Sequence, residues 1–211
     1  MNNKEGVTMK VEGNGWIAGG AFALAMGAAV PAPAAAQAVH PADRWEFAVE
    51  AGYLGKVKSN SPFHYRIAPV QVAWRSPSMT DLWRSPEGAR LTFRNRVAIV
   101  GEVITRGPEH HYFAVSGAPV FELWTADAKT AGFFEIGGGV GFTNSKGVEG
   151  GQGQDLAFNW YTQTGLRRQL TNDFGLTAAV YFTHHSNLGM TDPNPGIDVL
   201  GMNFGAVWSF K

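Results

Sequence analysis

A histidine, a serine and an aspartate close to the C-terminus have the residue types of a hydrolytic triad. His184 and Ser186 lie two positions apart, and Asp198 follows a segment that contains the turn sequence Pro-Asn-Pro-Gly. A serine becomes a nucleophile when a neighbouring base takes its proton, and an acid holds that base in the required tautomer. These residues therefore predict a serine hydrolase site with His184 as base, Ser186 as nucleophile and Asp198 as acid.

The alternation of side chains along strands places these three residues on one kind of surface. Side chains at positions i and i+2 share a face of a strand. His184 and Ser186 continue a face that starts at Phe174 and is otherwise apolar, and Asp198 begins an apolar face that ends at Phe210. The opposite faces carry Gly, Thr, Tyr, Asn and Ser, which suits the interior of a narrow barrel. The pattern predicts a triad on the lipid-facing side of a membrane β-barrel.

Two hydrogen-bond donors follow the serine directly. A serine hydrolase needs donors for the negative oxygen of its tetrahedral intermediate. The side chain of Asn187 and the backbone N–H of Gly189 are the candidates, because glycine permits an unusual turn at that position. An isolated His-x-Ser is better interpreted as a polar rim where a strand leaves the membrane. The acid in phase on the next strand and the Asn/Gly pair between them favour the catalytic interpretation.

Strand-like runs with turn residues between them cover most of the chain after residue 40. Eight such runs span residues 43–54, 64–75, 90–103, 112–125, 131–143, 155–170, 174–186 and 197–210. Their length and alternation predict an all-β fold, an eight-stranded antiparallel transmembrane β-barrel. Pro69 marks a bulge or an unpaired position in the second run, because proline cannot donate to a ladder.

Charged residues recur on the faces that the alternation assigns to the barrel interior. An eight-stranded barrel is filled by side chains, and buried charges need partners. We therefore interpret these residues as a structural ion-pair network and not as catalytic carboxylates. The predicted network consists of Glu46, Glu50, Arg94, Arg96, Glu122, Glu135 and Arg167.

The turns between the runs define the two ends of the barrel, with both chain ends taken to face the periplasm. The predicted external loops are 55–63, 104–111, 144–154 and 187–196. The segment 76–89 is then a periplasmic connection that is longer than barrels usually have there. The tetrapeptide Trp-Arg-Ser-Pro occurs at 74–77 and again at 83–86, and the sequence offers no explanation for this repeat.

The first 38 residues have the pattern of a secretory signal peptide. A weakly basic start precedes an apolar run that Pro31 ends, and Ala36-Gln37-Ala38 is a small-x-small cleavage site. Cleavage there leaves a single β-barrel domain over residues 39–211, exported to the bacterial outer membrane. The competing interpretation, a transmembrane anchor, requires a longer apolar run with fewer glycines.

Composition excludes several other classes of protein. A formal net charge of zero argues against a nucleic-acid binder, and the absence of cysteine rules out a disulfide framework. Gly137-x-Gly139-x-Gly141 opens no helix and is therefore not a nucleotide loop. The catalytic scheme requires neither a metal nor a cofactor, and the sequence indicates no oligomeric state.

The C-terminal motif resembles the signature of a known enzyme family. His184-x-Ser186-Asn187-x-Gly189, followed by Pro193-Asn194-Pro195-Gly196-Ile197-Asp198, is similar to the motif of lipid A 3-O-deacylases of the PagL type. Gly151-Gln152-Gly153 adds to the resemblance, which extends over the mature chain. It implies an outer-membrane acyloxyacyl hydrolase on an eight-stranded barrel, with His184, Ser186 and Asp198 as its triad and Asn187 and Gly189 at the oxyanion.

The chain departs from that family pattern in three places. Family members usually carry glutamate where this chain has Asp198, and a small residue where it has Leu188. The chain also ends Phe210-Lys211, whereas outer-membrane barrels commonly end on the aromatic residue.

The expected function is hydrolysis of the ester-linked acyl chain at the 3 position of lipid A, the lipid part of lipopolysaccharide. The expected partners are this substrate and the lipids of the outer membrane. Two alternatives stay open: another lipid-active barrel, such as a phospholipase or an acyltransferase, and a non-enzymatic envelope barrel that binds partners through its loops.

Overall fold

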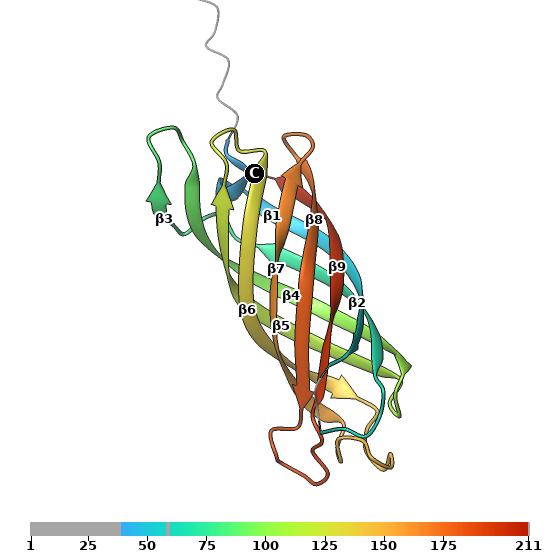
Figure 1. Ribbon diagram of the computed structural model, residues 1–211. Coiled ribbons are helices and arrows are strands. Elements are labelled where there is room, and N and C mark those ends of the chain that lie inside the picture. The colour runs from blue at the N-terminus through green and yellow to red at the C-terminus, as the bar shows by residue number, and fades with distance from the viewer. Residues whose placement is uncertain (1–38, 58–59, 211) are drawn as a thin grey trace, which may run out of the picture. The chain divides into compact units, whose positions relative to one another are not determined.

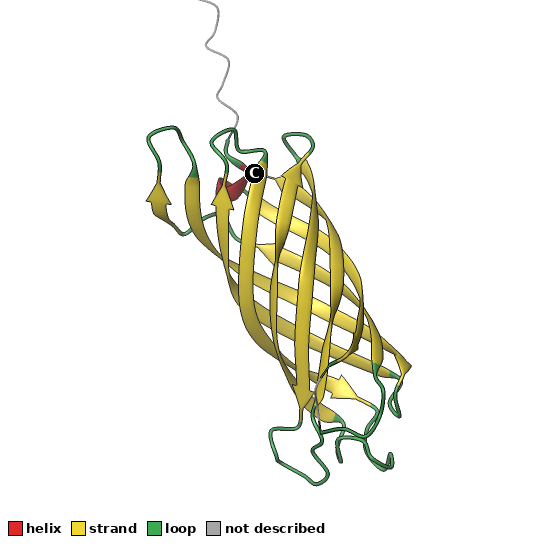
Figure 2. Cartoon of the chain, viewed as in Figure 1, coloured by secondary structure: helices red, strands yellow, loops and turns green. Residues whose placement is uncertain are grey.

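The computed structural model describes residues 39–57 and 60–210, so the predicted signal peptide at 1–38 lies outside the described residues. The chain forms strands joined by turns and loops, with a short 3-10 helix, η1 (Pro41–Asp43), before the first strand (Figure 2). The strands are β1 (Trp45–Lys56), β2 (Arg66–Arg75), β3 (Thr80–Arg84), β4 (Arg90–Arg106), β5 (His111–Trp124), β6 (Thr130–Thr143), β7 (Leu156–Gln169), β8 (Phe174–Ser186) and β9 (Ile197–Phe210). In this described part, no helix has the length and apolarity needed to cross a membrane.

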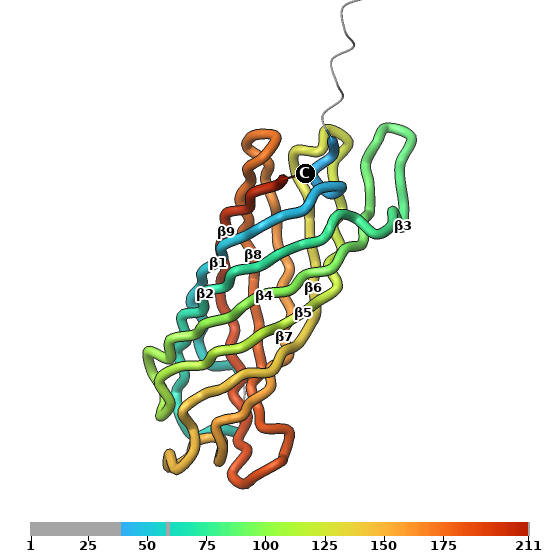
Figure 3. Tube along the Cα trace, turned by 180° about the vertical axis from the view of Figure 1, so that it is seen from behind, coloured from blue at the N-terminus to red at the C-terminus, as the bar shows by residue number. Residues whose placement is uncertain are grey.

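The strands form a closed antiparallel barrel. β1 pairs with both β2 and β9, β2 also pairs with β4, and the strands from β4 to β9 pair in chain order. Figure 3 shows β1 running beside β9, so that the first and the last strand of the chain are neighbours. Of the nine strands, β3 alone stands outside this ring. The predicted eight-stranded antiparallel β-barrel is therefore confirmed.

The short strand β3 was not predicted from the sequence. It pairs with an extension of β4 through Thr80↔Phe93 and Arg84↔Arg90, and forms a hairpin at the barrel end that holds η1 (Figure 1). The segment 76–89 is thus a structured hairpin arm and not a plain connection. Each Trp-Arg-Ser-Pro copy covers the end of a strand, β2 or β3, where proline cannot continue the ladder.

Pro69 lies at a break in the pairing of β2 with β1, whereas on the other side it stays opposite Glu102 of β4. The β1–β2 register runs from Ala51↔Val70 to Leu54↔Ile67, and the two positions between Ile67 and Val70 have no partner on β1. Prediction of an unpaired position there is confirmed.

The barrel interior holds the predicted ion-pair network. Glu50 accepts from Arg75 at 2.6 Å and from Arg96 at 2.8 Å, and Arg96 also lies 3.5 Å from Glu135. All four side chains are buried. Arg75 is an addition to the residues predicted from the sequence, where the irregularity at Pro69 obscures the alternation of β2.

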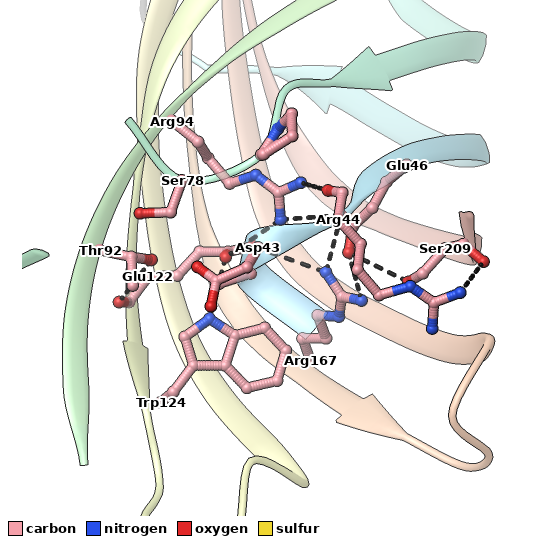
Figure 4. A network of polar contacts seen from close by, with 12 residues as sticks. Asp43, Arg44, Glu46, Ser78, Thr92, Arg94, Glu122, Trp124, Arg167 and Ser209 are labelled. Carbon is pink, nitrogen blue, oxygen red and sulfur yellow. Dashed lines mark hydrogen bonds and ion pairs between the residues drawn. The ribbon is translucent and has the colours of Figure 1, made fainter. Parts of the chain in front are cut away.

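A second part of the network lies nearer the end of the barrel that holds η1 (Figure 4). Glu46 lies 2.7 Å from Arg167 and 3.1 Å from Arg94. Both arginines also approach Glu122, which accepts a hydrogen bond of 2.9 Å from the indole of Trp124. Because every carboxylate here has an arginine partner, these groups stabilise the fold and leave the chemistry to another surface.

The outer wall of the barrel is apolar and carries aromatic side chains near the η1 end. Phe47 packs against Trp74 and Trp208, with ring centroids 5.7 and 6.0 Å apart, and Trp208 packs against Phe174 at 5.4 Å. Aromatic clusters of this kind mark the level where a membrane barrel meets the headgroup region.

The Arg96 guanidinium offers a direct test of the interior network. We expect Arg96→Met to lower the free energy of unfolding by about 3–5 kcal/mol, because Glu50 and Glu135 lose a partner while they stay buried. Urea unfolding of the refolded barrel in lipid vesicles, followed by tryptophan fluorescence, measures this change.

Arg84→Met is the matched control for that measurement. Arg84 also pairs with a carboxylate, Asp81, but its side chain is mostly exposed. Its loss should cost less than about 1 kcal/mol. Equal small effects for the two variants would contradict a structural role for the buried network.

Candidate active site

The predicted base and acid face each other across two neighbouring strands. His184 lies near the end of β8, Asp198 near the start of β9, and the two are Cα partners in the β8–β9 register. The Nδ1 atom of His184 lies 2.6 Å from Oδ1 of Asp198. The shorter aspartate reaches the ring because it stands directly opposite, so no longer side chain is needed. With Nδ1 engaged, Nε2 is the ring atom available to a nucleophile.

The predicted nucleophile is the last residue of the same strand. Ser186 follows His184 by two positions on β8 and pairs with Phe158 of β7. Its side chain is largely buried under the neighbouring loops. Among the described residues no hydrogen bond joins its hydroxyl to His184, and catalytic hydrogen bonds are often loose before substrate binds. The structure thus brings all three predicted triad residues to one hairpin.

Two residues that the sequence analysis did not assign to the site surround the His184 ring. Trp160 is the β7 partner of His184, with ring centroids 6.1 Å apart. Gly196 has a φ of +66°, and a Cβ there would lie 3.1 Å from Cε1 of His184. Glycine therefore lets the loop backbone lie against the imidazole. The sequence signal was present in Pro-Asn-Pro-Gly, but it indicated only a turn.

Asn187 and Gly189, the predicted oxyanion donors, form hydrogen bonds within the β8–β9 loop and from that loop to the β6–β7 loop. The Asn187 side chain donates to the carbonyl oxygens of Gln152 at 2.5 Å and Thr191 at 2.7 Å. The Gly189 N–H donates to Oδ1 of Asn187 at 2.8 Å. In this arrangement both groups hold the segment after Ser186 in place, and their role toward an oxyanion stays a prediction.

Gln152 connects the site to the loop between β6 and β7. Besides accepting from Asn187, it donates from Nε2 to the carbonyl oxygen of His185 at 3.1 Å, and it is buried. The motif Gly151-Gln152-Gly153 entered the sequence analysis only through a family resemblance. Its structural role is to fix the backbone on both sides of Ser186.

The same loop is hydrogen-bonded to other loops at this end of the barrel. The Ser145 hydroxyl accepts from the Gln152 N–H and donates to Glu109 at 2.7 Å. Glu109 also accepts from the Tyr65 hydroxyl at 2.7 Å. A continuous chain of buried polar contacts therefore runs from the β1–β2 loop through the β4–β5 and β6–β7 loops to Asn187. These contacts link the β8–β9 loop to the three other loops at this end of the barrel.

His185 points away from this site, as strand alternation predicts. Its Nε2 atom lies 3.2 Å from Glu102 inside the barrel, and its ring packs on Tyr112 with centroids 4.6 Å apart. His184 and His185 therefore lie on opposite faces of β8. In the described residues, no group of three or more His, Cys, Asp or Glu side chains is placed to hold a metal ion.

Exposed apolar side chains surround the triad on the outer wall. Trp160, Leu200 and Met202 flank it on the strands, and Leu188 and Met190 stand on the loop above it, all well exposed. The His184–Asp198 pair and the nearby Ser186 thus lie at the edge of an apolar outer surface. Such an arrangement can transfer an acyl group from a lipid ester, because the ester can reach the serine without leaving the apolar phase.

Comparisons with known proteins identify the family of this chain. The family model described as lipid A 3-O-deacylase (PagL) matches residues 64–206. The lipid A deacylase PagL of Bordetella bronchiseptica is 28% identical over 103 residues, which cover 47% of this chain and 52% of that protein. The chain thus aligns with about half the length of this relative.

A solved structure supports the fold independently. The crystal structure of the outer membrane enzyme PagL superposes with a TM-score of 0.51 at 22% identity, covering 76% of this chain and 97% of the other. The family model spans well over half of the chain, including the His184 to Asp198 hairpin. The chain therefore belongs to the lipid A 3-O-deacylase (PagL) family.

Proposed function

We propose that this protein is an outer-membrane esterase that removes the ester-linked acyl chain at the 3 position of lipid A. The observation that carries this proposal is the His184–Asp198 contact of 2.6 Å beside Ser186, on the lipid-facing wall of the barrel. Family membership supplies the substrate class. Residues 1–38 act as a cleaved signal peptide, and residues 39–211 form the mature domain in the outer membrane.

The reaction follows from the positions of the three side chains. Ser186 attacks the ester carbonyl while Nε2 of His184 takes the hydroxyl proton. His184 then gives this proton to the departing 3-hydroxyl oxygen of the sugar, which leaves the acyl chain on Ser186. Water, deprotonated by His184, attacks the acyl-serine, and the fatty acid departs as Ser186 regains its proton. Asp198 holds Nδ1–H and stabilises the imidazolium in both halves of the reaction.

Stabilisation of the oxyanion requires a change in the loop after Ser186. Asn187 and Gly189 are adjacent to the nucleophile and carry the needed N–H groups, but these donate to Gln152, Thr191 and Asn187 itself. We propose that substrate replaces one of these acceptors, so that the loop opens when lipid A binds. The hydrogen bonds of Asn187 then exchange between a resting and a catalytic arrangement.

Removal of either reacting side chain should abolish activity. We expect Ser186→Ala and His184→Ala each to lower the rate of lipid A deacylation on the order of a thousandfold or more, because the triad acts as a unit. Mass spectrometry of lipid A from cells that express each variant measures the product. The same lipid extracts report phospholipid cleavage, which would indicate a phospholipase instead.

His185→Gln is the matched control for this experiment. It alters the neighbouring histidine on the opposite face, and glutamine retains a donor for buried Glu102. Its deacylation rate should stay within a few-fold of wild type, provided that the barrel shows native heat-modifiable migration. Near-normal turnover by Ser186→Ala or His184→Ala would refute the triad.

The acid at position 198 can be tested by exchange. We expect Asp198→Asn to lower the rate by about a hundredfold or more, since aspartate-to-asparagine in a serine protease triad costs roughly 10⁴-fold. Asp198→Glu should be slower than wild type but faster than Asp198→Asn, because the direct register already brings aspartate to 2.6 Å. Indistinguishable kinetics for the three forms would remove Asp198 from the mechanism.

The orientation of the barrel can be tested by labelling, because the chain has no cysteine. A single cysteine at Glu149, in the exposed β6–β7 loop, should react with a membrane-impermeant maleimide on intact cells. A single cysteine at Ala126, exposed in the β5–β6 turn at the opposite end, should react only after the outer membrane is permeabilised. The reverse result would place the triad at the periplasmic end, away from surface lipid A.

A further inference from the structure

Two arginines stand side by side on the wall of the barrel opposite the triad. Arg66 begins β2 and Arg106 ends β4, and the register makes them Cα partners. They lie at the same barrel end as the β8–β9 loop. In the closed order of strands, β8 and β4 are separated by β9, β1 and β2, so this wall faces away from His184 and Ser186.

A bulge in β4 brings Arg106 to the outer surface. Ile67 pairs with Ile104 but Arg66 pairs with Arg106, so Thr105 is an extra residue in the ladder. Its hydroxyl donates to the carbonyl oxygen of Arg66 at 3.1 Å. Even-numbered residues of β4 otherwise point into the barrel and are buried, whereas Arg106 is exposed beside exposed Arg66. Bulges commonly redirect a side chain in this way.

This pair carries two like charges with no acid between them. In contrast to the interior arginines, neither Arg66 nor Arg106 forms an ion pair among the described residues. Like charges directly opposite on paired strands are destabilising. His111, exposed on β5 and paired with Val103 of β4, lies on the same rim. An anion held between the guanidinium groups would relieve the repulsion, and guanidinium forks match phosphate oxygens.

An apolar groove of about 370 Å³ opens directly below these charges. Ala68 follows Arg66 on the outer face of β2, and Gly101 and Val103 form the β4 side of the groove. A Cβ at Gly101 would lie 3.5 Å from the Phe113 ring, so a larger side chain there would fill the space. This wall thus has two arginines at the end of the strands and an apolar groove next to them.

We propose that this wall is a second lipid site, which holds an intact phosphorylated lipid A molecule without cleaving it. A sugar phosphate lies between Arg66 and Arg106, and one acyl chain occupies the groove at Gly101. The choice of lipid A rests on the proposed function and orientation, whereas the charge and the groove are independent of the triad. A molecule bound here lies too far around the barrel for its ester to meet Ser186.

Native mass spectrometry of the detergent-purified mature protein tests this site. The probe is a bisphosphorylated lipid A whose 3-position chain is ether-linked, so that an esterase cannot release it. Binding to the double variant Arg66→Gln/Arg106→Gln should be weaker by roughly tenfold or more, because two charge-assisted contacts are lost. A phosphate-free form of the probe should bind wild type and this variant equally.

Two further variants make the result specific. Lys129→Gln/Arg168→Gln removes the same charge from the other barrel end and should bind the probe like wild type. Gly101→Leu keeps both arginines but fills the groove, and should also weaken binding severalfold. Three results would overturn the site. The first is unchanged binding of the probe by Arg66→Gln/Arg106→Gln, and the second is an equal loss of binding in Lys129→Gln/Arg168→Gln. The third is that wild type binds phosphatidylglycerol as strongly as the probe. Because binding is measured without turnover, a failure of the deacylase assignment would be seen separately.

Discussion

Closure of the backbone hydrogen-bond ladder is the constraint on which the rest of this molecule depends. A strand edge exposed to hydrocarbon leaves N–H and C=O groups without partners, which costs several kcal/mol per group. The β1–β9 and β2–β4 pairings remove both edges. Eight strands leave room for side chains only, so charged groups that point inward need polar or charged partners beside them. Glu46 and Glu50, each between two arginines, are the result.

Closure of the barrel also explains why the proposed active site lies on the outer surface. In a soluble hydrolase the substrate enters a cavity, but here the space within the barrel is occupied by the ion-pair network. The proposed reacting groups therefore lie on the wall, where alternation puts His184 and Ser186 on one face and His185 on the other. A barrel wall surrounds a nucleophile less than a cavity does, and the loops at this end of the barrel supply further contacts. The buried hydrogen bonds of Gln152 and Asn187 hold the backbone on both sides of Ser186. In a soluble hydrolase the walls of a cavity provide this support.

Strand alternation carried most of what the sequence could predict. It located the eight barrel strands, the inward charges and the shared face of the triad, because each depends on a period of two within one strand. What it missed depends on contacts between distant segments or on backbone conformation. β3 is five residues between prolines and forms only because β4 extends to meet it. Gly196 and Gln152 act through three-dimensional proximity to His184 and Asn187. The spacing of Asn187 and Gly189 in the sequence does not indicate the hydrogen bonds that these residues form.

The direct register between His184 and Asp198 has a consequence for how such a site can be built. In the proposed mechanism base, nucleophile and acid all come from one hairpin, which is supported by Trp160 of β7 and by Gln152 of the β6–β7 loop. The site is therefore modular, and could be grafted as a cassette onto another eight-stranded barrel of matching tilt. The graft must also carry a glycine where Gly196 meets the imidazole and a glutamine donor from the preceding loop. In the proposed mechanism the activity then depends on one hairpin and its supporting loop, and the other strands serve as the scaffold.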